Sequence, residues 1–122
     1  LRKPHFSENY NAKFLQADYL GAIRDCDEAL RIQPNYVFAY NNRAAARFKA
    51  KDYAGAISDS NEAIKLDSKY GFAYLTRANA KEMNKDFEGA CQDWKTASQY
   101  GVKSAQSFLR ADCWERYNIK VD

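Results

Sequence analysis

Tyr53-Ala54-Gly55-Ala56-Ile57-Ser58-Asp59 has two related copies along this chain of 122 residues, and all three share the Gly-Ala pair and the final Asp. The other copies lie at residues 19–25 and 87–93, so each interval is 34 residues (19 to 53 and 53 to 87). A further alanine follows each copy at a constant distance, as Ala29, Ala63 and Ala97. A period kept in phase three times without an insertion indicates stacked structural repeats. The repeats span about 3–36, 37–70 and 71–104, within a single domain covering 1–122.

Each repeat is predicted to contain two helices. In the second repeat, small and apolar residues from Tyr53 through Ala56 to Ala63 follow helical spacing. Asp52 precedes this stripe and is the predicted N-cap, and Asp18 and Asp86 stand at the equivalent positions. The preceding helix, over 38–49, contains three consecutive alanines, which are strong helix formers. The sequence therefore predicts an all-α fold.

The recurring alanines predict where the two helices of a repeat meet. Antiparallel helices approach closely only where their side chains are small, and Ala44, Ala56 and Ala63 provide such a seam. Tyr40 is expected to fill the space beside it. A hairpin of this size does not bury its apolar stripe alone, so neighbouring hairpins are expected to stack.

The spacing of aromatic, large and small residues at a 34-residue period resembles the tetratricopeptide repeat. Asn42-Arg43 and the block at 55–59 are similar to a bacterial-type subclass of that family. The resemblance implies a right-handed superhelical solenoid of three hairpins, whose first helices line a concave groove. It also implies a capping helix over about 105–118, whose expected apolar residues are Phe108, Leu109, Ala111, Cys113, Trp114 and Tyr117. Trp114 is alternatively an exposed anchor for another subunit.

The first repeat departs from this pattern. Tyr10 stands where the close helix contact calls for a small residue, and Asn9 stands where the later repeats have Arg43 and Arg77. We therefore expect a wider first hairpin, or a first helix that is shifted or frayed.

The groove implied by the resemblance is the expected binding surface for a protein or peptide. Asn side chains there are suited to bracket an extended backbone, and Phe and Leu side chains offer apolar pockets. The alternative is that Phe38 and Phe72 only pack between hairpins and that the groove stays empty. The predicted groove residues are Asn11, Phe14, Leu15, Phe38, Asn41, Asn42, Ala45, Phe48, Lys49, Phe72, Leu75, Thr76, Asn79, Glu82 and Met83.

Some members of the family grip the C-terminal carboxylate of heat-shock chaperones with a clamp of three basic residues and two Asn. Asn11 and Asn42 match the two Asn positions, whereas Ser7, Phe72 and Thr76 occupy the basic ones. Without cations a carboxylate has little to hold it. The sequence therefore predicts a neutral or mixed peptide ligand and disfavours a chaperone tail.

Recurring Arg and Asp residues predict structural ion pairs. Arg43 and Arg77 replace an apolar residue that is usual at that point of the repeat, and Asp residues recur on the second helices. We predict pairs between adjacent hairpins, Arg43 with Asp25 and Arg77 with Asp59. Pairing within one hairpin and a plain solvated face are the alternatives.

Composition excludes several other classes of protein. Apolar residues at 46% and charged residues at 29% are close to globular averages, so a folded domain is expected. The net charge of +3 comes from interleaved basic and acidic residues, which disfavours nucleic-acid binding. No apolar stretch approaches the ~20 residues of a membrane span.

No pattern indicates catalysis, a cofactor or a metal. His5 is the single histidine, and the sequence has no Gly-rich phosphate loop or paired-histidine motif. Cys26, Cys91 and Cys113 are too far apart for a zinc motif, and two of the three are expected to lie on apolar helix faces as small apolar residues. The chain is therefore predicted not to be an enzyme and to need no cofactor.

A third possibility is a structural module that self-associates or spaces the domains of a larger protein. The chain starts at Leu1 without a Met or a signal sequence, so we expect a mature or trimmed fragment. The compartment stays open, with the cytoplasm slightly favoured.

Overall fold

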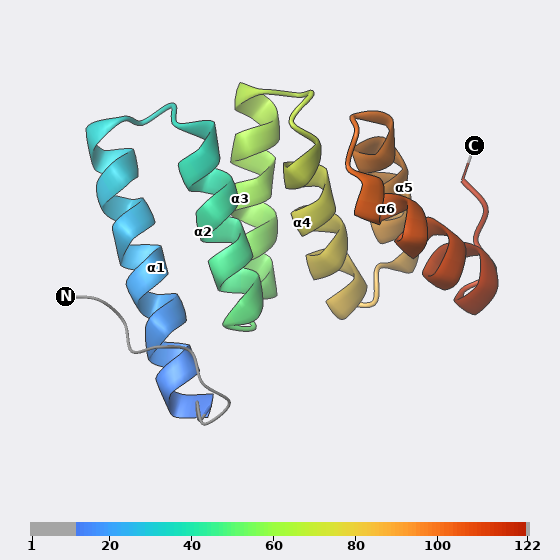
Figure 1. Ribbon diagram of the computed structural model, residues 1–122, viewed down its shortest axis with the longest axis horizontal. Helices are drawn as coiled ribbons and strands as arrows, with labels where there is room; N and C mark the ends of the chain where they lie inside the picture. Colours follow the sequence, from blue (N-terminus) through green and yellow to red (C-terminus); the bar gives the residue numbers. More distant parts are fainter. Residues whose placement is uncertain (1–11, 122) are drawn as a thin grey trace.

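The computed structural model describes residues 12–121, and in this range the chain forms only helices and their connections (Figure 1). The helices stand in a row, with α1 at one edge and the C-terminal helices at the other. None of the helices within 12–121 is long and apolar enough to cross a membrane. In chain order they are α1 (Ala12–Ile32), α2 (Val37–Lys49), α3 (Tyr53–Leu66), α4 (Gly71–Met83), α5 (Phe87–Gln99), α6 (Lys103–Phe108) and the π-helix η1 (Leu109–Arg116).

Two hairpins, α2–α3 and α4–α5, form the centre of the molecule. Lys51 and Lys85 adopt the left-handed conformation, with φ of 70° and 65°, and reverse the chain between the helices of each pair. The carboxylate of Asp52 then accepts a hydrogen bond from the backbone N–H of Gly55 at 2.9 Å. Asp86 caps α5 in the same way. The predicted N-caps at these two aspartates are confirmed.

Small residues form the contact within each hairpin, as the sequence predicts. Ala44, Ala56 and Ala63 are completely buried where α2 meets α3. Ala78, Ala90 and Ala97 are equally buried between α4 and α5. A larger side chain at these positions would have to displace its neighbours, because the alanines leave no exposed surface.

Replacing Ala56 by Leu is therefore expected to lower the free energy of unfolding by about 1–3 kcal/mol, because the added side chain overpacks the seam. Urea denaturation followed by circular dichroism measures the loss. The matched control is Ala54→Leu, two residues earlier in α3 and exposed to solvent. Equal stability of the two variants would contradict a tight seam at Ala56.

The first repeat differs from the prediction. The turn expected in its middle is not formed, because α1 runs unbroken from Ala12 to Ile32. Asp18 therefore lies inside a helix, and its predicted role as an N-cap is wrong. Ala17 stands where the later repeats have the left-handed Lys51 and Lys85, and alanine is the strongest helix former. The beginning of the repeat, with Tyr10 and Asn11, lies outside the described residues.

The C-terminal helices α6 and η1 pack against α5 and cover the end of the row. Phe108 stacks on Trp94, with ring centroids 5.2 Å apart, and Leu109 and Cys113 are buried beside them. Helical structure spans Lys103–Arg116 rather than about 105–118. Ala111 and Trp114 are exposed, so their predicted contribution to the cap is wrong. They lie on the side of the terminal helix that faces away from α5.

A disulfide links the terminal helix to the last hairpin. Cys91 of α5 and Cys113 of η1 are both completely buried and are joined, with their Cα atoms 5.8 Å apart. The prediction that these cysteines occupy apolar positions holds, but the covalent bond was not predicted. Their separation of 22 residues conceals the fact that η1 folds back onto α5. Cys26 is a free thiol, and burial raises its pKa.

Candidate interaction surface

Four aromatic rings form a continuous row across the beginnings of α2 and α4. Tyr36 contacts Phe38 at 6.0 Å between ring centroids, Phe38 contacts Tyr70 at 5.5 Å, and Tyr70 contacts Phe72 at 5.9 Å. Tyr36 and Tyr70 occupy the N-cap positions, and each Phe follows two residues later. We call Tyr36, Phe38, Tyr70 and Phe72 the aromatic row.

The two Phe rings of the aromatic row are open to solvent. Phe38 is 54% exposed and Phe72 is 53% exposed, although both are large apolar side chains. Packing between the hairpins therefore leaves about half of each Phe ring uncovered, and occupation of the groove by a ligand stays a prediction. Exposed apolar groups gathered in one place indicate a binding surface more strongly than isolated ones.

Two buried polar residues lie beside the aromatic row and join α2 to α4. Asn41 and Thr76 are only 8% and 9% exposed. The hydroxyl of Thr76 lies 3.2 Å from Asn41 Oδ1 and 3.0 Å from the carbonyl oxygen of Phe72, and these acceptors share its single hydrogen. Burial raises the pKa of the Tyr70 phenol, while a hydrogen bond with the Asn41 side chain acts in the opposite direction. The Asp67 carboxylate also acts to raise the pKa of Tyr70, so a negative charge lies near the row, although Asn41 and Thr76 themselves carry none.

Several other predicted groove residues are engaged in contacts within the chain. Asn79 accepts a hydrogen bond from Trp94 Nε1 at 3.1 Å, and Glu82 accepts one from the Tyr117 hydroxyl at 2.7 Å. Desolvation, and then the bond to Glu82, raise the pKa of Tyr117 to about 12. Phe48 packs against the Tyr53 ring at 5.5 Å. These polar groups are less available to a ligand than the sequence suggests.

The remaining predicted groove residues fall into three groups. Leu75 packs against the apolar core of the C-terminal half, and Ala45 is half-buried. Asn42, Lys49 and Met83 are exposed. Asn11 lies outside the described residues, and the structure describes only the helical backbone at Phe14 and Leu15.

Tyr36 and Tyr70 were missed as candidate site residues. They lie in the connections before α2 and α4, whereas the prediction considered only residues spaced along the helices. The signal was nevertheless present, because Tyr36 and Tyr70 are separated by the repeat length, as Phe38 and Phe72 are.

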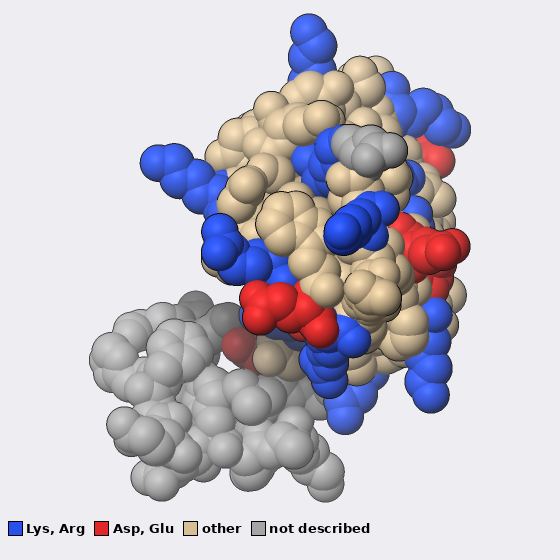
Figure 2. Space-filling model, turned by 90° about the vertical axis from the view of Figure 1, so that its right-hand side faces the viewer, with Lys and Arg blue, Asp and Glu red and all other residues tan. Residues whose placement is uncertain are grey.

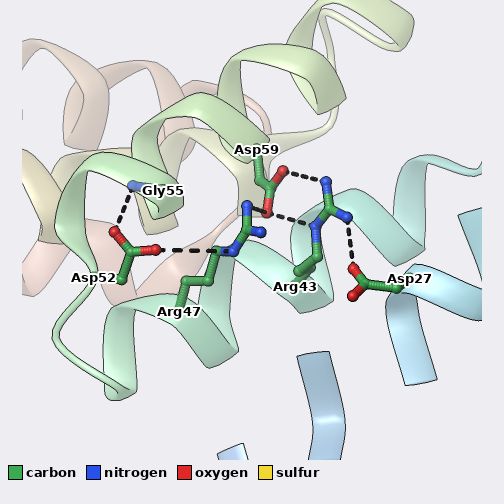
Figure 3. A network of polar contacts seen from close by, with 6 residues as sticks. All are labelled: Asp27, Arg43, Arg47, Asp52, Gly55 and Asp59. Carbon is green, nitrogen blue, oxygen red and sulfur yellow. Dashed lines mark hydrogen bonds and ion pairs between the residues drawn. The ribbon is translucent and has the colours of Figure 1, made fainter. Parts of the chain in front are cut away.

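A network of ion pairs joins α1, α2 and α3 (Figure 3). Arg43 donates to both carboxylate oxygens of Asp59, at 2.9 and 2.7 Å, and to Asp27 at 2.7 Å. Arg47 adds a third hydrogen bond to Asp59 at 2.9 Å. The hydrogen bonds with Asp59 are the main reason why the pKa of Arg43 is raised.

The predicted partners in this network are wrong, and the alternative of pairing within one hairpin is correct. Arg43 reaches α1 through Asp27 rather than Asp25, because residues two apart on a helix point in nearly opposite directions. Arg77 pairs with Asp93 at 2.8 Å, not with Asp59. Arg77 also donates a hydrogen bond to Asn61 of α3, in the preceding hairpin, at 2.9 Å. Asn61 is the residue of that hairpin equivalent to Asp27, one repeat length further along the chain.

The described residues offer no alternative chemistry for a site. No group of His, Cys, Asp and Glu among them is arranged to hold a metal ion. Figure 2 views the C-terminal end of the molecule, where Lys and Arg side chains stand apart from one another with acidic groups between them. That face therefore lacks the continuous basic stripe that a phosphate backbone requires.

The two helical hairpins and their seams of small residues define a helical-repeat solenoid. No protein-family model matches the sequence, and no curated protein does. Solved structures do match, and each comparison covers 80% of this chain. The first TPR domain of Spaghetti (RPAP3), bound to the HSP90 peptide SRMEEVD, is 30% identical over 79% of its length, with a TM-score of 0.73.

Two further structures agree with this match. The TPR2B domain of yeast Sti1, in a complex with an Hsp70 peptide, is 25% identical over 84% of its length, with a TM-score of 0.72. The second TPR domain of human RPAP3, in complex with the HSP70 peptide SGPTIEEVD, is 28% identical over 82% of its length, with a TM-score of 0.71. The chain belongs to the tetratricopeptide repeat family.

Proposed function

We propose that this chain is a protein-interaction module that binds a peptide segment of another protein along the aromatic row. The observation that carries the proposal is the exposure of Phe38 and Phe72, 54% and 53%, at the same place in consecutive repeats. Leaving two large apolar rings in water costs free energy that a bound ligand recovers. No catalytic reaction is part of this proposal.

The ligand that we propose differs in charge from those of the similar structures. Those domains bind HSP90 or HSP70 peptides, and two of these peptides end in Glu-Glu-Val-Asp. In this chain the clamp positions at 72 and 76 hold Phe72, which is exposed, and Thr76, which is buried and bonded to Asn41. Neither residue offers a cation to a carboxylate. A neutral or mixed segment therefore fits better.

We also assign the chain to the bacterial-type subclass, on the basis of Asn42-Arg43 and the block at 55–59.

Self-association is the second candidate function. Ile32 at the end of α1 is 68% exposed, and Trp114 on the terminal helix is 46% exposed. The helices that carry them, α1 and the C-terminal helix, lie at opposite edges of the row, an arrangement suited to head-to-tail stacking (Figure 1). Sedimentation equilibrium separates a monomer from such an assembly.

Selection from a random peptide library tests the proposed function. We expect peptides that bind the wild-type chain and lose at least about tenfold in affinity to Phe72→Ala, because this change removes an exposed anchor without opening the core. Leu20→Ala is the matched control, since Leu20 is a similarly exposed apolar residue on α1. Circular dichroism should show equal helicity in all three proteins. Selected peptides that bind Phe72→Ala as tightly as the wild type would overturn the proposal.

A further inference from the structure

We infer that an uncovered face of α1 binds one α-helix of another protein, and that this helix carries two basic side chains four residues apart. The face consists of Ala22, Asp25 and Ala29, which we call the open seam. It lies on a different helix from the aromatic row, so this inference goes beyond the proposed function. The equivalent helices of the next two repeats, α3 and α5, show what such a face holds.

The open seam has the same residues as the seams of the two complete hairpins. Its counterparts are Ala56, Asp59 and Ala63 of α3, and Ala90, Asp93 and Ala97 of α5. All six counterparts are buried, the alanines completely and the aspartates to 2% and 4% exposure. By contrast, Ala22 and Asp25 are exposed and Ala29 is half-buried. In the part of the chain that the structure describes, α1 therefore has a helix-contact face that no helix covers.

The opposite side of α1 is already in use. Asp27 on that side binds Arg43 of α2 at 2.7 Å. In the next repeat, Asn61 of α3 binds Arg77 of α4 in the same way, at 2.9 Å. Asp25 points in nearly the opposite direction from Asp27, because it lies two residues away on the same helix. Figure 1 shows α1 at one edge of the row with α2 beside it, so the open seam is left for a further helix.

The buried aspartates of the two covered seams show the charge of the helix that belongs there. Each receives two cations that stand four residues apart on the covering helix. These groups are Arg43 and Arg47 with Asp59, and Arg77 and Lys81 with Asp93, at distances of 2.7 to 3.0 Å. Charge-assisted contacts of this kind are stronger than neutral ones. The carboxylate of Asp25 is the third of the series, and a helix with the same pair of cations complements it.

The covering helices also share a small residue at the point of closest contact. Ala44 of α2 and Ala78 of α4 each follow the first basic residue directly, and both are completely buried. Both helices have 13 residues, which corresponds to a length of about 20 Å. The helix that fits the open seam therefore has the pattern basic, small, any, any, basic near its middle.

Other occupants lack this pattern or have already used it. The positions of this chain one repeat before those of α2 hold Asn9 and Tyr10, a neutral amide in place of the first cation and a large ring in place of the alanine. A second copy has the pattern in its own α2, but there Arg43 binds Asp59 and Ala44 is completely buried. An acidic helix is repelled by the charge of the open seam.

Isothermal titration calorimetry of the full chain with a capped peptide of the α2 sequence, residues 36–50, tests the inference. We expect saturable binding that weakens at least about tenfold in Asp25→Asn and in Ala22→Leu, because these changes remove the anion and fill the seam. Asp27→Asn, which removes a carboxylate from the other side of α1, and Phe72→Ala should bind as the wild type does. A matched peptide with Gln in place of both Arg residues should give no saturable heat.

Denaturation of the same variants separates the other occupants. Because Ala22 is exposed, Ala22→Leu should leave the midpoint of urea denaturation unchanged, unlike Ala56→Leu. A decrease as large as that of Ala56→Leu would show that the chain covers its own seam, and would overturn the inference. A dimer in sedimentation equilibrium that Ala22→Leu dissociates would assign the seam to a second copy, with the same consequence. The absence of saturable binding, or binding that Phe72→Ala abolishes and Asp25→Asn does not, would also overturn it.

Discussion

Replacing Asp59 by Ala is expected to lower the free energy of unfolding by about 3–5 kcal/mol. Asp59 is 2% exposed and accepts three hydrogen bonds, two from Arg43 and one from Arg47. Its removal leaves two partly buried guanidinium groups without their common anion, and one of these groups also holds α1 against α2. Chemical denaturation of the purified variant measures the loss.

The matched control for this prediction is Asp27→Ala. Asp27 binds the same guanidinium at 2.7 Å, but half of its side chain is exposed to solvent, so its loss should cost only about 0–1 kcal/mol. A cost for Asp59→Ala no larger than that for Asp27→Ala would show that burial does not control the strength of the network.

Breaking the disulfide between Cys91 and Cys113 is expected to destabilise the chain by about 3 kcal/mol, because the bond closes a loop of 22 residues in the unfolded state. Cys113→Ala, compared with the oxidised wild type in thermal or urea denaturation, measures the effect. The cap formed by α6 and η1 should loosen first, and hydrogen exchange in these helices should rise before exchange in α2 and α3.

Cys26→Ala provides the control, since Cys26 is a free thiol and should contribute little. Equal stability of the wild type with and without reductant would contradict a stabilising bond.

Disulfides persist in oxidising compartments and are rare in the cytosol. The presence of this bond therefore favours an oxidising compartment over the cytoplasm, which the sequence slightly favoured.

Features that recur within a repeat were predictable from the sequence. Seam alanines such as Ala56 and capping aspartates such as Asp52 act through contacts within one hairpin, and such contacts are set by spacing along two neighbouring helices. The same spacing predicts that Phe38 and Phe72 lie at equivalent places, and their exposure followed only from the structure.

Features that depend on the exact placement of one element against another were not predictable. A difference of two positions on α1 decides that Asp27, and not Asp25, faces Arg43. Ala17 continues a helix where a turn was expected, because local helix propensity outweighs the repeat pattern there. The disulfide depends on how η1 returns to α5, and the spacing of the cysteines carries no information about that return.

The candidate site was predicted in part. Periodicity identified Phe38 and Phe72, but Asn79 and Glu82 turn out to bind Trp94 and Tyr117 within the chain. The sequence gives no sign of these contacts, because their partners belong to α5 and to the residue that follows η1, which are distant along the chain.

In our proposal, the aromatic row is the surface that holds a ligand. Titration of the ¹⁵N-labelled chain with a library-selected peptide, followed by amide chemical shifts, locates the binding surface residue by residue. We expect the largest shifts on Phe38, Asn42 and Phe72, and no change on Ser58 of α3 or Gln92 of α5. Shifts concentrated on α3, α5 or Trp114, with none along the row, would contradict it.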